Sequence, residues 1–258
     1  MLIGVSAGAH PCAAQGHESP PPGLEIGIDE KLGDFVPMDL GFLDADGDSV
    51  YLRDVIDKPT VLTLVYYHCP TICKPLLGGV VEVMDKTNLE PGYDYNVLTI
   101  SFDETDTPQS ADAIRDNFTE ALEKDLVPGA WRFLTADSST IARLTDSVGF
   151  RFVRRENDFA HGTSLIFLSP DGKIVRYLYG LRFMPFDLKM AVVEAGKGSV
   201  APSIARVLQY CFSYDPEGRK YALNVNRLVG TVILLFAVGW VVYLSAAGRR
   251  KRKARTQE

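Results

Sequence analysis

Two cysteines separated by three residues carry the strongest chemical signal in this sequence of 258 residues. Cys69 and Cys73 follow residues 59–67, an apolar and β-branched run that predicts a buried central strand. A helix is predicted to begin near Cys73 and to end near Lys86, so Cys73 falls in its first turn. A helix N-terminus favours the thiolate, the form of cysteine that binds metals and attacks disulfides. The pair therefore lies at the end of a strand, where sites form in α/β sheets.

The spacing of Cys69 and Cys73 leaves three interpretations open. Thiolates suit Cu(I) and zinc, and three intervening residues give a loop in which both sulfurs can point at one soft cation. The same residues can form a redox pair for thiol–disulfide exchange, although dithiol oxidoreductases usually separate their cysteines by two residues. On spacing alone, a structural disulfide of an oxidising compartment is the third interpretation.

His161 is the second signal. It lies in the run Phe-Ala-His-Gly-Thr-Ser, a predicted loop just before an apolar strand, and Gly162 allows close approach of the backbone there. Alone, a histidine in such a loop is usually a solvated surface residue. Together with the two cysteines it completes a three-coordinate site of two thiolates and one imidazole, which suits copper. We therefore predict Cys69, Cys73 and His161 as metal ligands.

Other polar residues are expected near this site. His68 adjoins Cys69, but neighbouring side chains in a loop point in different directions, so we expect His68 to be exposed or to lie behind the ligands. Asp103, Glu104 and Asp106 follow the end of another predicted strand. Their role stays open between helix capping in a solvated loop, docking of a partner, and tuning of the site.

Strands and helices alternate along the chain to position these residues. An opening β-hairpin is predicted within residues 28–57, around the turn Asp-Ala-Asp-Gly-Asp. Further strands are predicted at 59–67, 96–102, 131–135, 163–169 and 173–179, and helices at 73–86, 107–124, 138–148 and 185–195, with Ser138 as the cap of the third helix. The fold class is therefore α/β with an antiparallel end, the plan of a thioredoxin-like domain of the peroxiredoxin type with an N-terminal β-hairpin.

One transmembrane helix is predicted near the C-terminus. Residues 228–247 contain no charged side chain, and a helix of this length spans roughly 30 Å, the thickness of a bilayer core. The tail that follows, residues 248–258, holds six basic residues and one acid. Basic residues beside a span stay cytoplasmic, so the tail is predicted to be cytoplasmic and the main domain periplasmic, in a single-pass membrane protein.

Charge limits the class of partner. The 247 residues before the tail hold 21 basic and 32 acidic side chains, a net charge of −11. An acidic body argues against nucleic acid as the main partner. The membrane, contacted through residues 228–247, is the partner that the basic tail indicates.

The chain divides into six predicted segments. Residues 1–14 are interpreted as the remnant of a signal peptide, 15–32 as a Pro-rich linker, 33–196 as the thioredoxin-like copper-binding domain, 197–227 as a juxtamembrane connector, 228–247 as the transmembrane helix and 248–258 as the basic cytoplasmic tail. The connector contains Cys211, which has no evident partner if Cys69 and Cys73 pair. We expect Cys211 to be dispensable for copper binding.

Three sequence segments resemble the SCO/SenC family, whose members are copper chaperones for cytochrome c oxidase assembly. They read Y-H-C-P-T-I-C-K, V-L-T-I-S-F-D-E-T-D-T-P and H-G-T-S-L-I-F-L-S-P-D-G-K, and the resemblance covers about residues 33–196. It implies that Cys69, Cys73 and His161 match the family's copper ligands. The acidic motif is one residue shorter than the commoner family form, and the predicted anchor is C-terminal where many members have it at the N-terminus.

Two functions follow from this resemblance and from the residues themselves. The first is a metallochaperone that delivers copper to the dinuclear copper site of cytochrome c oxidase, with the copper-bearing subunit and other copper carriers as partners. This is a binding and delivery protein rather than an enzyme. The alternative is a membrane-anchored thiol–disulfide oxidoreductase acting on cysteines of the same or other extracytoplasmic proteins. His161 distinguishes the two, because a pure dithiol exchanger does not need a distant histidine.

Overall fold

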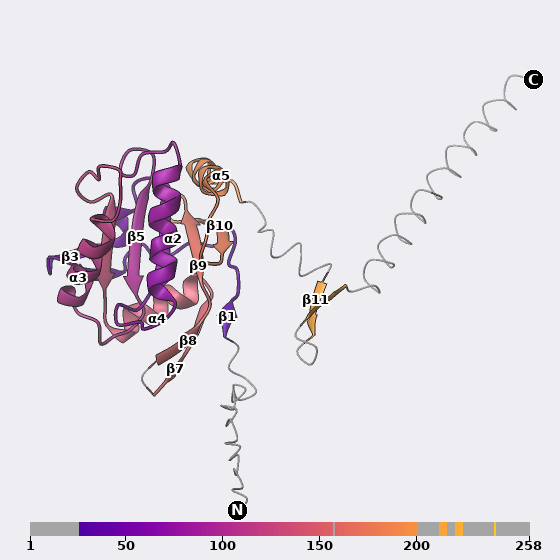
Figure 1. The fold of residues 1–258 in the computed structure, drawn as a ribbon, viewed down its shortest axis with the longest axis horizontal. Helices are drawn as coiled ribbons and strands as arrows, with labels where there is room; N and C mark the ends of the chain where they lie inside the picture. The colour runs from indigo at the N-terminus through magenta and orange to yellow at the C-terminus, as the bar shows by residue number, and fades with distance from the viewer. Residues whose placement is uncertain (1–25, 157, 201–211, 216–219, 224–239, 241–258) are drawn as a thin grey trace, which may run out of the picture.

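A seven-stranded sheet in the order β10-β9-β4-β5-β6-β2-β3 forms the centre of the domain (Figure 1). The computed structural model describes residues 26–156, 158–200, 212–215, 220–223 and 240. The strands of this sheet are β2 (Gly41–Asp44), β3 (Ser49–Tyr51), β4 (Thr60–Val65), β5 (Asn96–Ser101), β6 (Trp131–Thr135), β9 (Ser164–Leu168) and β10 (Ile174–Tyr179). β4, β5 and β6 run parallel, and β9 and β10 continue the sheet antiparallel. The predicted α/β, thioredoxin-like plan with an antiparallel end is confirmed.

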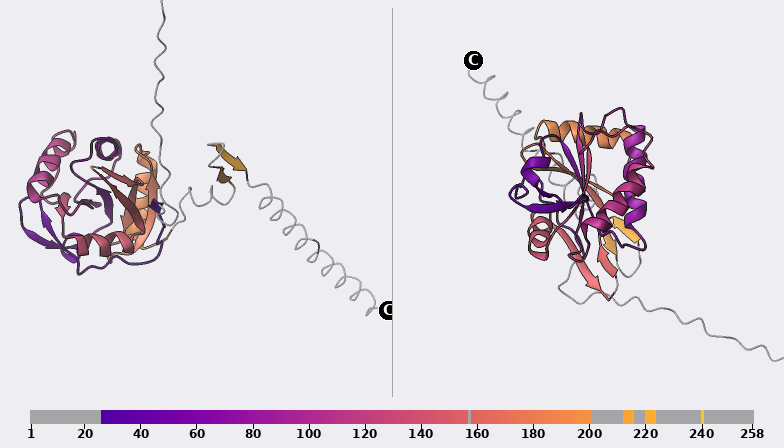
Figure 2. Two further views of the ribbon diagram at one scale, coloured as in Figure 1. Left: turned by 90° about the horizontal axis from the view of Figure 1, so that it is seen from below. Right: turned by 90° about the vertical axis from the view of Figure 1, so that its left-hand side faces the viewer.

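Helices cover this sheet and leave its central strands fully buried (Figures 1 and 2). They are α1 (Leu52–Val55), α2 (Cys73–Lys86), α3 (Pro108–Thr119), α4 (Ser138–Ser147) and α5 (Pro185–Gly196). Every residue of β4 and β5 is buried, as expected for parallel strands covered on both faces. The β-branched run that begins at Thr60 therefore forms a fully buried strand, and the loop that carries the cysteines follows this strand.

The end of one helix and the cap of another differ from the prediction. α3 ends at Thr119 rather than at residue 124, because the next segment is held by side chains outside the helix. The Asp85 carboxylate accepts the backbone N–H groups of Glu123 and Lys124, at 3.1 and 3.2 Å. α4 begins as predicted, but its cap is Asp137 rather than Ser138. The Asp137 carboxylate accepts the first free N–H groups of the helix, whereas Ser138 is already its first helical residue.

A small second sheet stands apart from the main one. It consists of β1 (Gly27–Ile28), β7 (Phe150–Arg155) and β8 (Asp158–His161), in the order β1-β7-β8. No strand was predicted at residues 150–161, and residues 27–28 fell in the predicted linker, with residue 28 also at the start of the predicted hairpin. β7 and β8 form an antiparallel hairpin that projects from one end of the main sheet (Figures 1 and 2). His161 is therefore the last residue of a strand, not part of a loop as predicted.

Several predicted segments lie outside the described residues. These are the signal-peptide remnant at residues 1–14, the transmembrane span at 228–247 apart from Trp240, the basic tail, and Cys211. Among the residues that are described, no helix is long and apolar enough to cross a bilayer. Within the predicted connector, β11 (Phe212–Asp215) pairs antiparallel with β12 (Lys220–Leu223).

Gly78 and Gly79 of α2 differ in how closely the rest of the domain packs against them. A Cβ atom added at Gly79 would lie 2.0 Å from the carbonyl oxygen of Leu181, whereas one added at Gly78 would meet nothing within 4 Å. Gly79→Ala is therefore expected to lower the free energy of unfolding by about 1–3 kcal/mol through overpacking. Gly78→Ala should raise it by up to about 1 kcal/mol, because alanine favours the helix over glycine. Urea denaturation of both variants checks the pair, and equal effects would contradict the packing.

Candidate metal centre

The cysteine loop joins the buried end of β4 to the N-terminus of α2. Cys69 lies in a turn in which its backbone N–H donates to the carbonyl oxygen of Tyr66 at 3.3 Å, and Cys73 is the first residue of α2. The backbone N–H of Cys73 donates to the Cys69 sulfur at 3.3 Å. Both thiols are free and buried. The local sequence therefore brings the two sulfurs to one place, as the spacing predicted.

The two thiols differ in their readiness to ionise. Burial by itself would raise the pKa of Cys69, but the Tyr66 hydroxyl, the Cys73 thiol and the N–H groups of Cys73 and Thr71 together lower it below the ordinary value. The pKa of Cys73 is raised, chiefly because the thiol is buried and also because the Cys69 sulfur lies close to it. Cys69 is therefore the more reactive thiol, and Cys73 is the one that stays protonated when no metal is bound.

This difference predicts the order of alkylation. In the reduced, metal-free chain, iodoacetamide is expected to label Cys69 first, because only the thiolate reacts. As the pH rises, Cys69 should begin to react at a lower pH than an unperturbed cysteine, and Cys73 at a higher one. Peptide mass spectrometry after short pulses at several pH values measures both rates. Equal rates, or faster labelling of Cys73, would show that the assignment of the two roles is wrong.

His161 lies close to this pair although it is 88 residues from Cys73 in the chain. Its Nε2 atom lies 4.0 Å from the Cys73 sulfur. Its Nδ1 atom is 2.8 Å from the carbonyl oxygen of Gly162, and because a carbonyl can only accept, Nδ1 carries the proton. The lone pair of the neutral imidazole is thus on Nε2, the atom that faces Cys73. A backbone carbonyl that fixes the tautomer in this way is usual for a metal-binding histidine.

The surroundings of His161 keep its ring neutral and fixed in orientation. Burial lowers the pKa of the imidazole, against the raising effect of the Gly162 carbonyl and of Asp158. The ring packs against three aromatic neighbours, with centroid distances of 5.0 Å to Phe102, 5.9 Å to Phe150 and 6.0 Å to Tyr66. A neutral imidazole is the form that can bind a metal ion, and this environment maintains it.

The donor set fits a soft metal ion. A cysteine sulfur and a histidine nitrogen that share one ion such as zinc are at most about 4.4 Å apart, given bond lengths of about 2.3 and 2.1 Å. The 4.0 Å between Cys73 Sγ and His161 Nε2 lies within that reach. Among the described residues, no three histidine, cysteine, aspartate or glutamate side chains already converge as a complete metal cluster.

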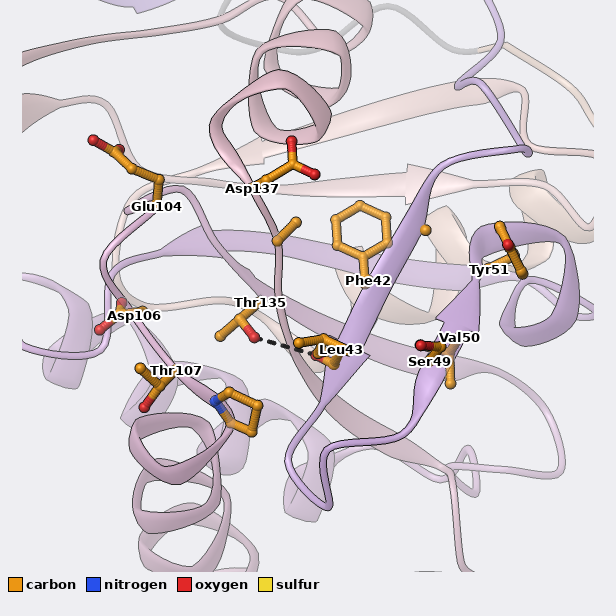
Figure 3. A pocket seen from close by; sticks show the side chains of 13 residues that line it. Phe42, Leu43, Ser49, Val50, Tyr51, Glu104, Asp106, Thr107, Thr135 and Asp137 are labelled. Carbon is orange, nitrogen blue, oxygen red and sulfur yellow. Dashed lines mark hydrogen bonds between the residues drawn. The ribbon is translucent and has the colours of Figure 1, made fainter.

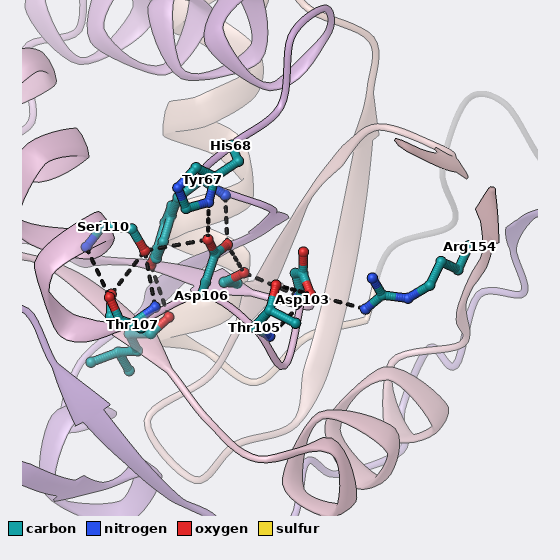
Figure 4. A network of polar contacts seen from close by, with 10 residues as sticks. Tyr67, His68, Asp103, Thr105, Asp106, Thr107, Ser110 and Arg154 are labelled. Carbon is teal, nitrogen blue, oxygen red and sulfur yellow. Dashed lines mark hydrogen bonds and ion pairs between the residues drawn. The ribbon is translucent and has the colours of Figure 1, made fainter. Parts of the chain in front are cut away.

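A buried carboxylate holds the loop from behind (Figure 4). Asp106 accepts the backbone N–H of Tyr67 at 2.7 Å and the hydroxyl of Ser101 at 2.6 Å, and it contacts His68 Nδ1 at 2.6 Å. The His68 side chain is 73% exposed, as the sequence analysis expected of a residue that is not a ligand. Asp106 therefore fixes the backbone that leads into Cys69 rather than capping α3, whose cap is Thr107.

The first acid of the same motif holds the hairpin that carries His161. Asp103 accepts the backbone N–H and the hydroxyl of Thr105, at 3.0 and 2.9 Å, and pairs with Arg154 of β7 at 2.9 Å (Figure 4). Burial opposes ionisation, but these hydrogen bonds and the nearby guanidinium hold the pKa of Asp103 below its usual value. Arg154 also pairs with Glu104 at 2.9 Å. Arg154 is a site-supporting residue that the sequence analysis did not find.

Sequence analysis also missed a contact between Tyr66 and Asp158. The Tyr66 hydroxyl donates to the Asp158 carboxylate, and the two residues are 92 positions apart in the chain. Tyr66 was read only as part of the apolar strand, and no local pattern marks Asp158. The available signal was a tyrosine at the end of the apolar run 59–67, because a buried hydroxyl needs a partner.

A groove of about 510 Å³ lies beside this network (Figure 3). The strands β2 and β3 form one side, and the other side is formed by residues 104–108 and 135–137 apart from Thr105. Glu104 and Asp106 line it, but Cys69, Cys73 and His161 do not. The groove is thus separate from the atoms of Cys69, Cys73 and His161 that would bind a metal ion.

Comparison with known proteins identifies the family. The family model described as SCO1/SenC matches residues 31–185. The chain belongs to the SCO1/SenC family. It is 23% identical over 151 residues to the SCO1 protein homolog of Bacillus subtilis, an alignment that covers 57% of this chain and 75% of that protein. The resemblance seen in the three sequence segments is therefore confirmed.

Solved structures share the fold of this SCO1/SenC domain. Arabidopsis thaliana ScoI, solved with copper bound, has a TM-score of 0.51 at 23% identity, over 61% of this chain and 96% of that one. BsSco, described as a member of the Sco family of cytochrome c oxidase assembly proteins and studied for a disulfide switch, has a TM-score of 0.52 at 21% identity. That alignment covers 66% of this chain and 97% of BsSco.

Proposed function

We propose that this chain binds one copper ion through Cys69, Cys73 and His161 and delivers it to the dinuclear copper site of cytochrome c oxidase. The observation that carries the proposal is the approach of His161 Nε2 to within 4.0 Å of the Cys73 sulfur. Two thiolates and a neutral imidazole match the preference of copper for soft and imidazole ligands. The copper bound in the Arabidopsis relative and the assembly role stated for BsSco support the same function.

Copper transfer to a purified target tests this function. The reduced, copper-loaded full chain is mixed with the metal-free copper-bearing subunit of the oxidase, and the absorption of the dinuclear centre is followed over time. The wild-type chain should transfer its copper, and the His161→Ala variant should not. If free copper loads the target as fast as the loaded chain does, the chain is not acting as a delivery protein.

Thiol–disulfide exchange is the second candidate, and the unequal thiols favour it. In this reaction the Cys69 thiolate attacks a target disulfide, and Cys73 then attacks the mixed disulfide. Two electrons pass to the target as its two thiols are released, and a Cys69–Cys73 disulfide forms. His161 has no part in these steps, so His161→Ala should keep reductase activity while losing copper transfer. Copper-free reduction of an oxidised target by both variants distinguishes the two functions.

We also propose that residues 228–247 span the membrane, with the domain periplasmic and residues 248–258 cytoplasmic. The absence of charge in this segment and the basic residues that follow support this topology. A reporter that works only in the cytoplasm, fused after Glu258, is expected to be active. Activity only of a reporter that requires export would reverse the orientation.

A further inference from the structure

The hairpin that carries His161 has little support of its own. β7 and β8 belong to the small sheet rather than to the main one, and their only other strand neighbour in the part of the chain described is the two-residue β1. The outer half of the hairpin is largely exposed. The position of His161 relative to the cysteines therefore depends on contacts that cross from the hairpin to the main sheet.

Besides the approach of His161 to Cys73, polar contacts of Arg154 and of Asp158 make that crossing among the described residues. Arg154 pairs with Asp103, whose side chain is 10% exposed, and with Glu104, but the Arg154 side chain is itself 46% exposed, so solvent screens both ion pairs. The other contact joins Tyr66 to Asp158, and the Tyr66 side chain is only 3% exposed. A hydrogen bond from a buried hydroxyl to a carboxylate is among the stronger kinds. The Tyr66–Asp158 hydrogen bond is therefore the main polar contact that holds the β7–β8 hairpin against the rest of the domain.

The Tyr66–Asp158 hydrogen bond joins two residues that lie close in sequence to the proposed metal ligands. Tyr66 precedes Cys69 by three residues, and Asp158, the first residue of β8, precedes His161 by three. Phe159 and His161 are two apart in the strand and share a face, on which both pack against Tyr66 and Phe102. A shift at the start of β8 thus moves the imidazole relative to the Cys73 sulfur.

We propose that Tyr66 and Asp158 are positioning residues, whose hydrogen bond seats the His161 imidazole against the cysteine pair for copper binding. The inference rests on the proposed copper site and adds residues to it. Neither residue is a copper ligand in this arrangement. They act by fixing the distance between the segment that carries the cysteines and the strand that carries the histidine.

Copper titration of variants of the reduced full chain, in competition with a Cu(I) chelator, tests the proposal. Tyr66→Phe keeps the ring and removes only the hydroxyl, and Asp158→Ala removes the acceptor. Each is expected to weaken copper binding about 10- to 100-fold, the usual effect of losing a group that orients a metal ligand. Tyr67→Phe is the matched control, since its hydroxyl donates to the core carbonyl of Leu134 and does not touch the hairpin. It should leave the copper affinity unchanged.

A double-mutant cycle separates action through His161 from a general structural role. In a His161→Ala background, Asp158→Ala should have no further effect on copper affinity, whereas Tyr66→Phe also removes the hydroxyl that lowers the pKa of Cys69. In the metal-free chain that keeps His161, Tyr66→Phe and Asp158→Ala should each also speed hydrogen exchange of residues 150–161, without changing exchange in β4 and β5. A loss on Asp158→Ala that persists without His161 would overturn the proposal, since Asp158 would then not act through the imidazole. Wild-type affinity in both variants would overturn it as well, whereas failure of the wild-type chain to bind copper would refute the copper site itself.

Discussion

Replacing Cys69 or Cys73 by serine is expected to abolish tight copper binding. Each sulfur supplies one of the two soft ligands, and a serine hydroxyl is a hard, neutral donor at neutral pH. Loss of a group that only orients a ligand costs about 10- to 100-fold in affinity, so loss of a ligand should cost more than about 100-fold. His161→Ala should weaken binding as well, while leaving both thiolates in place. Competition titration of the reduced full chain with a Cu(I) chelator measures all three.

Two matched variants show whether these losses are specific. His68→Ala removes the histidine next to Cys69, whose side chain is 73% exposed and turned toward Asp106. Cys211→Ser removes a third thiol that the sequence analysis predicts to be dispensable. Both variants should keep the wild-type affinity. If instead all three predicted ligands can be replaced without loss, or if Cys211→Ser is as damaging as Cys69→Ser, the three-residue site is wrong.

Oxidation of the chain should eliminate copper binding completely, and a reductant should restore it. Cys69 and Cys73 are four residues apart at a loop–helix junction, and the Cys73 N–H lies 3.3 Å from the Cys69 sulfur, so the two sulfurs can reach bonding distance. A disulfide consumes both thiolates, which ligation requires. Copper and the disulfide therefore exclude each other.

Mass spectrometry after alkylation measures this exclusion. A Cys12→Ser/Cys211→Ser variant isolates the pair, because the chain has four cysteines. The oxidised, metal-free variant should take up no label, and the reduced one two labels. Copper loading before exposure to the oxidant should protect the thiols from forming the disulfide. Two labels after oxidation without copper would rule out the redox pair, even if copper binding is intact.

Local sequence patterns specify the cysteine half of the site. The buried strand β4, the loop and α2 are consecutive, and each is specified by a local pattern: a β-branched run, a proline-containing turn and a helical apolar stripe. The position of Cys73 at a helix N-terminus and the sheet with an antiparallel end follow from such patterns. The three motifs also carried the family resemblance, which covers the same domain as the family match.

Local patterns failed where side chains from elsewhere in the fold decide the outcome. The end of α3 depends on the Asp85 carboxylate. This carboxylate accepts the backbone N–H groups of Glu123 and Lys124, which the helical pattern had placed inside the helix. β7 and β8 escaped prediction because much of β7 is exposed and polar. The alternation Phe-Arg-Phe at the start of β7 stops at Val153, and β8 is only four residues long.

The histidine half of the site meets the cysteine half through contacts between segments that are distant in the sequence. His161 is 88 residues from Cys73, and Tyr66 is 92 residues from Asp158. No periodicity or spacing encodes contacts at such separations. They form because β9 pairs antiparallel with β4 and so returns the chain to the end of the sheet where the cysteine loop begins. The ionisation of the two thiols has the same origin, since Tyr66 and the degree of burial, rather than the residue type, separate the pKa of Cys69 from that of Cys73.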